Sequence, residues 1–278
     1  MATLVLATTT ISEMVPTYLD TILESHRRRA AKDERNWRSR VDEIRYDGPS
    51  FVLVLRQGSS PFIKVIAEVK RRSPSKGLLA PDLDVAALAE IYRDEGASAI
   101  SVLTDRDFFE GSMDDLHTVR RSVALPVLRK DFTVSENDVL DAVEAGASAV
   151  LLIVAALSDA ELSSFLSLSE ECGIDALVEI HDAQEARRAA DAGARIIGIN
   201  QRNLRTFDVN PEHAASLISE LPRECLTVCE SGLSTVADVE RAADAGFDAV
   251  LVGEAFITAT DPGAAVKSFA LVPSGQRA

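Results

Sequence analysis

One phrase recurs four times along this chain, and its spacing limits the possible fold more than any other feature. Each copy ends a helical pattern and opens an apolar run; the copies are Glu95–Ile100, Ala145–Val150, Ala192–Ile197 and Ala245–Val250. The glycine at the second position of each copy stands where the residue after a helix adopts a left-handed conformation before the next strand. Successive glycines are 50, 47 and 53 residues apart. Such a period is too long for one strand–helix unit and suits two.

Filling in the intervening elements predicts eight short strands, all apolar and rich in Val, Ile and Leu. They are Phe62–Val69, Ala99–Thr104, Pro126–Phe132, Ala149–Val154, Ala176–Ile180, Ile196–Asn200, Leu226–Ser231 and Ala249–Gly253. Helical patterns lie between them, and several begin with recognisable caps: capping-box spacing at Ser158–Glu161 and Asp182–Glu185, and Asn210 before Pro211. Strict alternation predicts a parallel sheet, either open or closed. Eight units in 278 residues favour a single (β/α)8 TIM barrel of class α/β.

Residues 1–61 stand outside the repeat. They are predicted to form an N-terminal helical extension of the same domain, covering the mouth or the bottom of a barrel over 62–270. Residues 271–278 are predicted to be a disordered tail. Within the extension, the mixed charges of Lys32–Arg40 favour a solvated helix face over a binding patch.

Charge and cysteine usage narrow the class of partner. The formal net charge of −15 argues against nucleic acid or an acidic membrane as a partner, but a few cationic groups and backbone N–H groups still suffice for a small anionic ligand. Three cysteines without CxxC spacing indicate a reduced, cytoplasmic protein. The threonine-rich start lacks a signal peptide's basic region, and no apolar stretch is long enough to span a bilayer.

Polar residues follow the predicted strands at the end where barrel enzymes carry their chemistry. Glu68 and Lys70 share one face of the first strand because they are two residues apart. Taken alone, this pair is as consistent with a structural ion pair as with catalysis. Five further strands add charged or amide groups at the same end: Lys130, Glu179, Asn200, Glu230 and Glu254. So many convergent acids and bases favour catalysis, and the two lysines beside carboxylates are expected to have shifted proton affinities that suit proton transfer near neutral pH.

The last two strand ends are typical of a phosphate site. Ser231–Gly232 and Gly253–Glu254 place glycines in the loops after strands seven and eight, where backbone N–H groups can approach an anion. Ser73 and Arg202 are candidates for side-chain contacts. Tight turns alone would also explain the glycines, and the two interpretations are compatible.

Other reactive residues receive structural interpretations. His181 is expected to start a loop or help to cap the following helix, and Cys229 to fill space in a buried strand. His26, His117 and His213 lie in helical patterns without ligand spacing. Because no HExxH, CxxC or carboxylate cluster of the metal-site type occurs, no metal is expected.

Taken together, these phrases resemble the indole-3-glycerol phosphate synthase family. The matching segments, in the family's order, are Ile66–Ser75, Phe108–Ser112, Asp114–Leu116, Pro126–Phe132, Leu151–Val154, Ala176–Glu179, Gly198–Leu204, Glu230–Gly232 and Val250–Glu254. The first segment and the Pro126–Phe132 segment are highly specific in combination. Gln201 departs from the asparagine that is commoner after Asn200, and residues 1–61 match only loosely.

The resemblance implies a cofactor-free carbon–carbon lyase of tryptophan biosynthesis, acting on 1-(2-carboxyphenylamino)-1-deoxyribulose 5-phosphate. Lys130 would be the general acid for ring closure, Lys70 would meet the substrate carboxylate and later assist the departing hydroxyl, and Glu68 would be the base for dehydration. Glu179 and Asn200 would orient the reacting centre. The implied substrate-binding residues are Ser73, Pro74, Phe109, Phe132, Arg202, Glu230, Ser231, Gly232, Gly253 and Glu254. The expected partner is this small phosphate, and the expected state a monomer or weak homo-oligomer.

Three alternatives compete with this assignment. The first is a related phosphate-binding barrel: a phosphoribosylanthranilate isomerase would use a Cys and Asp pair where the first strand here ends in Glu68 and Lys70, and a tryptophan synthase α subunit would use two carboxylates and lacks the Leu128–Phe132 phrase. The second is a catalytically silent paralogue, which would be expected to have lost Lys130 or Glu68, and both are present. The third alternative keeps the chemistry but assigns it to a specialised indole pathway.

Overall fold

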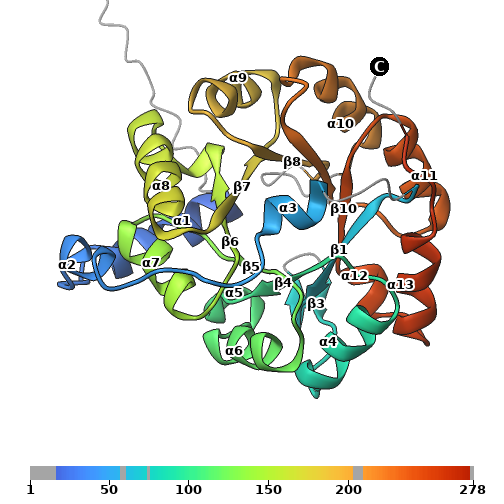
Figure 1. Cartoon of the computed structure of the whole chain (residues 1–278), viewed down its shortest axis with the longest axis horizontal. Helices are drawn as coiled ribbons and strands as arrows, with labels where there is room; N and C mark the ends of the chain where they lie inside the picture. Colours follow the sequence, from blue (N-terminus) through green and yellow to red (C-terminus); the bar gives the residue numbers. More distant parts are fainter. Residues whose placement is uncertain (1–16, 57–60, 74–75, 203–208, 276–278) are drawn as a thin grey trace, which may run out of the picture.

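The computed structural model describes residues 17–56, 61–73, 76–202 and 209–275 (Figure 1). Eight parallel strands close into a barrel in the order β1-β10-β9-β8-β7-β6-β5-β4, which confirms the predicted (β/α)8 fold. The strands are β1 Lys64–Val69, β4 Ala99–Leu103, β5 Val127–Lys130, β6 Ala149–Ile153, β7 Asp175–Ile180, β8 Ile196–Asn200, β9 Leu226–Glu230 and β10 Ala249–Val252. β5 ends two residues earlier than predicted, and just beyond its end the Asp131 carboxylate accepts the Phe132 N–H. A short hairpin, β2 Arg72–Ser73 with β3 Gly77–Leu78, follows β1.

The helices form a ring around the barrel (Figure 1). Those between or after the strands are α4 Val85–Asp94, α5 Arg106–Phe109, α6 Met113–Ser122, α7 Glu136–Glu144, η1 Val154–Ala156, α8 Asp159–Cys172, α9 Ala183–Asp191, α10 Pro211–Leu217, η2 Ile218–Glu220, α11 Val236–Asp244, α12 Glu254–Ile257 and α13 Pro262–Ala270. The Ser158–Glu161 capping box forms as predicted. All four repeat glycines adopt positive φ, from +79° at Gly146 to +100° at Gly96, as the pattern predicts. None of the helices in the described ranges is both long and apolar enough to cross a membrane.

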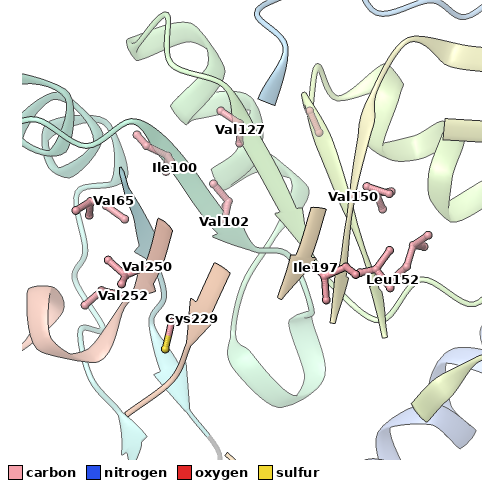
Figure 2. Close-up of a cluster of buried hydrophobic side chains, with 14 of the residues drawn as sticks. Val65, Ile100, Val102, Val127, Val150, Leu152, Ile197, Cys229, Val250 and Val252 are labelled. Carbon is pink, nitrogen blue, oxygen red and sulfur yellow. The ribbon is translucent and has the colours of Figure 1, made fainter. Parts of the chain in front are cut away.

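Side chains alternate between the two faces of the barrel wall, as strand geometry requires. One set points outward and packs beneath the helices; Figure 2 shows members of this cluster, among them Val65, Val102 and Val250. The other set, including Ile66 and Leu177, fills the barrel interior. Burying each such side chain contributes about 1.5–3 kcal/mol. The inward positions nearest the carboxyl ends of the strands are left for polar residues.

The N-terminal extension covers both ends of the barrel rather than one. Its helices are α1 Tyr18–Ala30, α2 Trp37–Val41 and α3 Phe51–Arg56. Phe51 and Leu55 of α3 are buried with the interior residues, so α3 closes the end where the strands begin. Arg27 of α1 instead contacts the Ala156 and Val134 carbonyls, which follow β6 and β5. α1 therefore lies at the opposite end, beside the strand termini that carry the polar residues.

The charged stretch Lys32–Arg40 attaches the extension to the barrel. Arg35 and Arg40 both pair with Asp141 of α7, at 2.7 Å. Arg40 also reaches Glu144, at 2.9 Å. The prediction that this stretch is a solvated helix face is therefore wrong for Arg35 and Arg40, whose partners lie about a hundred residues away in the chain.

The predicted disordered tail is wrong for residues 271–275. Val272 is buried, its carbonyl accepts the Ile63 N–H at 3.0 Å, and the Ser274 N–H donates to the Pro61 carbonyl at 2.7 Å. These bonds attach the segment to the chain just before β1. Residues 276–278 lie outside the described ranges.

Candidate active site

A pocket of about 600 Å³ opens at the carboxyl ends of the strands, which is an ordinary size for a small-molecule site. Every predicted site residue that the structure describes lines it: Glu68, Lys70, Ser73, Phe109, Lys130, Phe132, Glu179, Asn200, Arg202, Glu230, Ser231, Gly232, Gly253 and Glu254. Pro74 lies outside the described residues. Residues from nearly every part of the barrel thus meet in one cavity.

Glu68 lies between two ammonium groups. Its Oε1 is 2.8 Å from Lys70 Nζ, and its Oε2 is 3.7 Å from Lys130 Nζ. Burial opposes ionisation of this carboxyl, but the two lysines outweigh burial and hold the pKa of Glu68 below its ordinary value. The same attraction acts in reverse on Lys130, where Glu68, Glu230 and Glu179 overcome burial and raise the lysine pKa. The predicted shift of the lysine toward neutral pH is therefore wrong for Lys130, which is held firmly as an ammonium.

Glu230 is the group whose pKa moves toward neutrality. Burial and the nearby Glu179 carboxylate raise the pKa of Glu230 to about 8, although Lys130 Nζ lies 3.6 Å from its Oε2. Neither carboxyl oxygen has a hydrogen-bond partner among the described residues. The family resemblance assigned Glu230 to substrate binding, whereas its side chain points into the barrel beside Lys130. The inward direction of Glu230 could have been predicted from strand alternation, because Glu230 shares the face of the inward-pointing Val228.

Two glycines make room for these carboxylates. A Cβ on Gly253 would lie 2.5 Å from Glu68 Oε1, and a Cβ on Gly198 would overlap the Glu230 carboxylate. Gly198 was not identified from the sequence as a site residue. A glycine inside a buried strand is itself a signal of close approach by another group.

The loop after β9 passes through two successive residues with positive φ. Ser231 and Gly232 adopt φ of +66° and +68°. A positive φ at a serine is uncommon and is found disproportionately at functional sites. Gln201 holds this loop, because its buried Nε2 donates to the Ser231 carbonyl at 3.0 Å and to Cys229 Sγ at 2.8 Å. The departure from asparagine at position 201 therefore lies in direct contact with the predicted phosphate loop.

An aromatic wall faces the charged groups across the pocket. The rings of Phe109 and Phe132 lie 6.2 Å apart between centroids. Phe109 belongs to α5, which begins where the Asp105 carboxylate accepts the N–H groups of Phe108 and Phe109. Because α5 has a single turn, this cap helps to determine where the wall stands.

His26 connects α1 to this wall. Its Nε2 lies 2.8 Å from Asp105 Oδ2 and 3.8 Å from Asp131 Oδ1, and its ring packs 5.3 Å from that of Phe132. His26, Asp105 and Asp131 are the one group in the described ranges whose ligand atoms could surround a metal ion. Arg29 Nη2 approaches Nδ1 at 2.7 Å. Since arginine only donates, Nδ1 accepts and Nε2 carries the hydrogen given to Asp105. The group is therefore a completed hydrogen-bond network that fastens α1.

Comparison with known proteins agrees with this geometry. A family model described as indole-3-glycerol phosphate synthase matches residues 19–269. The indole-3-glycerol phosphate synthase of Chlorobium phaeovibrioides is 46% identical over 241 residues, covering 85% of this chain and 93% of that protein. The enzyme of the same name from Micrococcus luteus is 52% identical over 207 residues, covering 74% and 77%.

Among solved structures, the tryptophan synthase α subunit of Legionella pneumophila superposes with a TM-score of 0.58. That superposition covers 84% of this chain and 97% of the other at 14% identity, so it shows the shared barrel fold alone. The family match, by contrast, extends over α1, the whole barrel and the pocket. This chain belongs to the indole-3-glycerol phosphate synthase family.

Proposed function

We propose that the pocket converts 1-(2-carboxyphenylamino)-1-deoxyribulose 5-phosphate into indole-3-glycerol phosphate, the carboxy-lyase reaction of tryptophan biosynthesis that names the family. One observation carries the assignment of residues. Two ammonium groups, Lys70 and Lys130, converge on Glu68 inside a pocket that is also lined by the positive-φ turn Ser231–Gly232 and by the rings of Phe109 and Phe132. The substrate has a phosphate for the turn, an aromatic ring for the two phenylalanines, and a carboxylate and a ketone for the two ammonium groups.

Ring closure requires an acid at the ketone oxygen. The ring carbon that bears the carboxylate bonds to the ketone carbon, and the carbonyl electron pair moves to oxygen, which takes a proton from the Lys130 ammonium. The surrounding carboxylates keep Lys130 protonated until that negative charge develops. Glu230, 3.6 Å away and with a pKa near 8, is suited to return a proton to the lysine afterwards.

Decarboxylation and dehydration follow without a metal or an organic electron sink. The electrons of the breaking carbon–carboxylate bond neutralise the cationic nitrogen formed by closure, and carbon dioxide leaves. Glu68 then removes a carbon-bound proton while Lys70 protonates the departing hydroxyl, which leaves as water. The 2.8 Å separation of these two side chains puts the acid and the base within reach of adjacent substrate carbons. One proton is consumed over the whole sequence.

The remaining residues are assigned to binding. Glu179 and Asn200 orient the reacting centre, and the phosphate lies against Ser73, Ser231, Gly232, Gly253 and Glu254 with Arg202 nearby. Phe109 and Phe132 pack against the aromatic ring of the substrate. Cys229 of β9 cannot act as the catalytic cysteine that an isomerase would need in this pocket, because it belongs to the outward-facing cluster beneath the helices. We further propose that the chain acts in the cytoplasm as a monomer or weak homo-oligomer.

The deciding experiment is to incubate purified protein with the carboxyphenylamino-deoxyribulose phosphate and follow indole absorbance and fluorescence. Product formation supports the proposal. A folded protein that binds the substrate and releases no product would instead indicate the silent paralogue.

A further inference from the structure

His181 lies between two carboxylates just beyond the end of β7. Its Nδ1 is 3.1 Å from Glu185 Oε2 of α9, and its Nε2 is 3.4 Å from Glu179 Oε1. The ring is 16% exposed and is not among the residues that line the pocket. His181 therefore contacts the Glu179 carboxylate from outside the pocket lining.

The surroundings hold this imidazole firmly in place. Glu185 Oε2 accepts the backbone N–H of His181 at 2.7 Å as well as facing the ring. The predicted capping box would have directed Glu185 to the Asp182 N–H, but Asp182 caps α9 by itself and Glu185 turns to His181. His213 of α10 fixes the other side, since its Nε2 lies 2.8 Å from the His181 carbonyl. The interpretation of His181 as a residue that only starts a loop or helps a cap is thus incomplete.

The side chains inside the barrel call for one more proton than the two lysines carry. Glu68, Glu179 and Glu230 face two ammonium groups, Lys70 and Lys130, which leaves one carboxylate in excess if all are ionised. Among the described residues, the buried His181 Nε2 and both Glu230 oxygens lack hydrogen bonds. A buried carboxylate without a counter-charge is costly, so a proton is expected in this group of side chains.

We propose that His181, with one ring N–H directed at Glu185 and the other at Glu179, is the positioning residue that orients the Glu179 carboxylate and places a positive charge beside it. The inference rests on the proposed function of the pocket and extends it to a residue behind the pocket wall. Glu185 and Glu179 then act on the imidazolium from opposite sides. A neutral imidazole can donate to only one of them.

The ionisation of the ring is consistent with this arrangement. Burial lowers the imidazole's proton affinity, but Glu185, Glu179 and Glu230 together raise the pKa of His181 above its ordinary value. The charged groups that face it are these three carboxylates, with Lys130 beyond Glu230 and His213 at its carbonyl. As pH rises through the raised pKa, the charge is lost and Glu179 loses its donor. Because the Glu179 carboxylate is then no longer oriented, kcat should decline on the alkaline side.

The test uses His181→Asn, which keeps a hydrogen-bond donor but cannot carry a charge. We expect kcat to fall about 10- to 100-fold, as for other residues that orient a catalytic group, with KM changing far less. The alkaline decline of kcat that His181 causes should also disappear. His117→Asn, on the remote helix α6, is the matched control and should behave as the parent. A His181→Asn variant with parental kcat and pH profile would overturn the proposal.

A second readout does not depend on turnover. NMR titration of ring-labelled histidine in the full chain, assigned with the His181→Asn variant, should place the pKa of His181 above 6.5 and lower it in Glu185→Gln. A pKa at or below the ordinary value would refute the charged form even if the variants fold poorly. Absence of product from the parent enzyme, with the titration as expected, would instead count against the proposed function alone.

Discussion

Replacing Gly253 by alanine tests how closely the site depends on the position of Glu68. Gly253 precedes α12 with φ −123° and ψ −65°, so an alanine meets no left-handed strain there. Its Cβ would lie 2.5 Å from Glu68 Oε1 and 3.1 Å from Glu68 Cβ. Ordinary van der Waals contact begins at 3.4 Å. The carboxylate oxygen, which would lie at 2.5 Å from the new Cβ, must therefore retreat by about 0.9 Å. That movement opens the 2.8 Å contact with Lys70.

A displacement of about 1 Å in a reacting group can cost about 100-fold in rate, and overpacking of this kind costs about 1–3 kcal/mol in unfolding free energy. We therefore expect Gly253→Ala to fold and to lose about two orders of magnitude in kcat. The assay is the initial rate of indole formation at saturating substrate, which separates this effect from weaker phosphate binding, together with thermal unfolding.

Gly193→Ala is the matched control for that experiment. Gly193 has φ +83° and open space around its Cβ position, so alanine there should cost about 1–2 kcal/mol of stability and leave kcat unchanged. A Gly253→Ala enzyme with kcat within about threefold of the parent would refute the reasoning, because it would show that Glu68 can move without consequence.

Three further outcomes follow from the same contacts. Lys130→Ala should lower kcat/KM about 1000-fold in the indole assay. Lys267→Ala, on the surface, is the control and should keep the parental value. A Lys130→Ala enzyme as active as the parent would refute the general-acid role. Phe256→Ala, which empties a fully buried site, should cost about 3–5 kcal/mol by urea unfolding, and a loss under about 1 kcal/mol would contradict the packing. Hydrogen bonding from Arg27 lowers the pKa of Glu161 from 4.5 to about 2, so its contribution to stability is present above pH 4.5 and lost as pH falls toward 2. The difference in Tm between the parent and Glu161→Gln should shrink over that window, and a difference that does not change with pH would exclude the pairing.

Features that depend on local period could be predicted from the sequence. Alternation along buried strands put Glu68 and Lys70 on one face, and the repeat glycines marked where helices end. Barrel closure then brings the strand ends together, so the predicted residues share one pocket once the fold is known. No contact between them had to be predicted individually.

Features that depend on contacts between distant segments could not be predicted in this way. His26 meets Asp105 across 79 residues, and Arg27 meets Glu161 across 134, which no local pattern records. The direction of the Lys130 pKa shift required the sum of carboxylates from three other strands. The contact between Gln201 and the loop after β9 could not be predicted either, because its hydrogen bond to Ser231 crosses between neighbouring strand ends.

The closure of the barrel also bears on how the chain is made. β1 pairs with β10 through Lys64 and Ala249, which are 185 residues apart. At a synthesis rate of about 5–20 residues per second, the first strand waits roughly 10–40 s for that neighbour. Until then one edge of β1 exposes unpaired backbone groups, which invite pairing with other chains. The nascent protein is therefore an open sheet for most of its synthesis, and it becomes a barrel only when the last strand arrives.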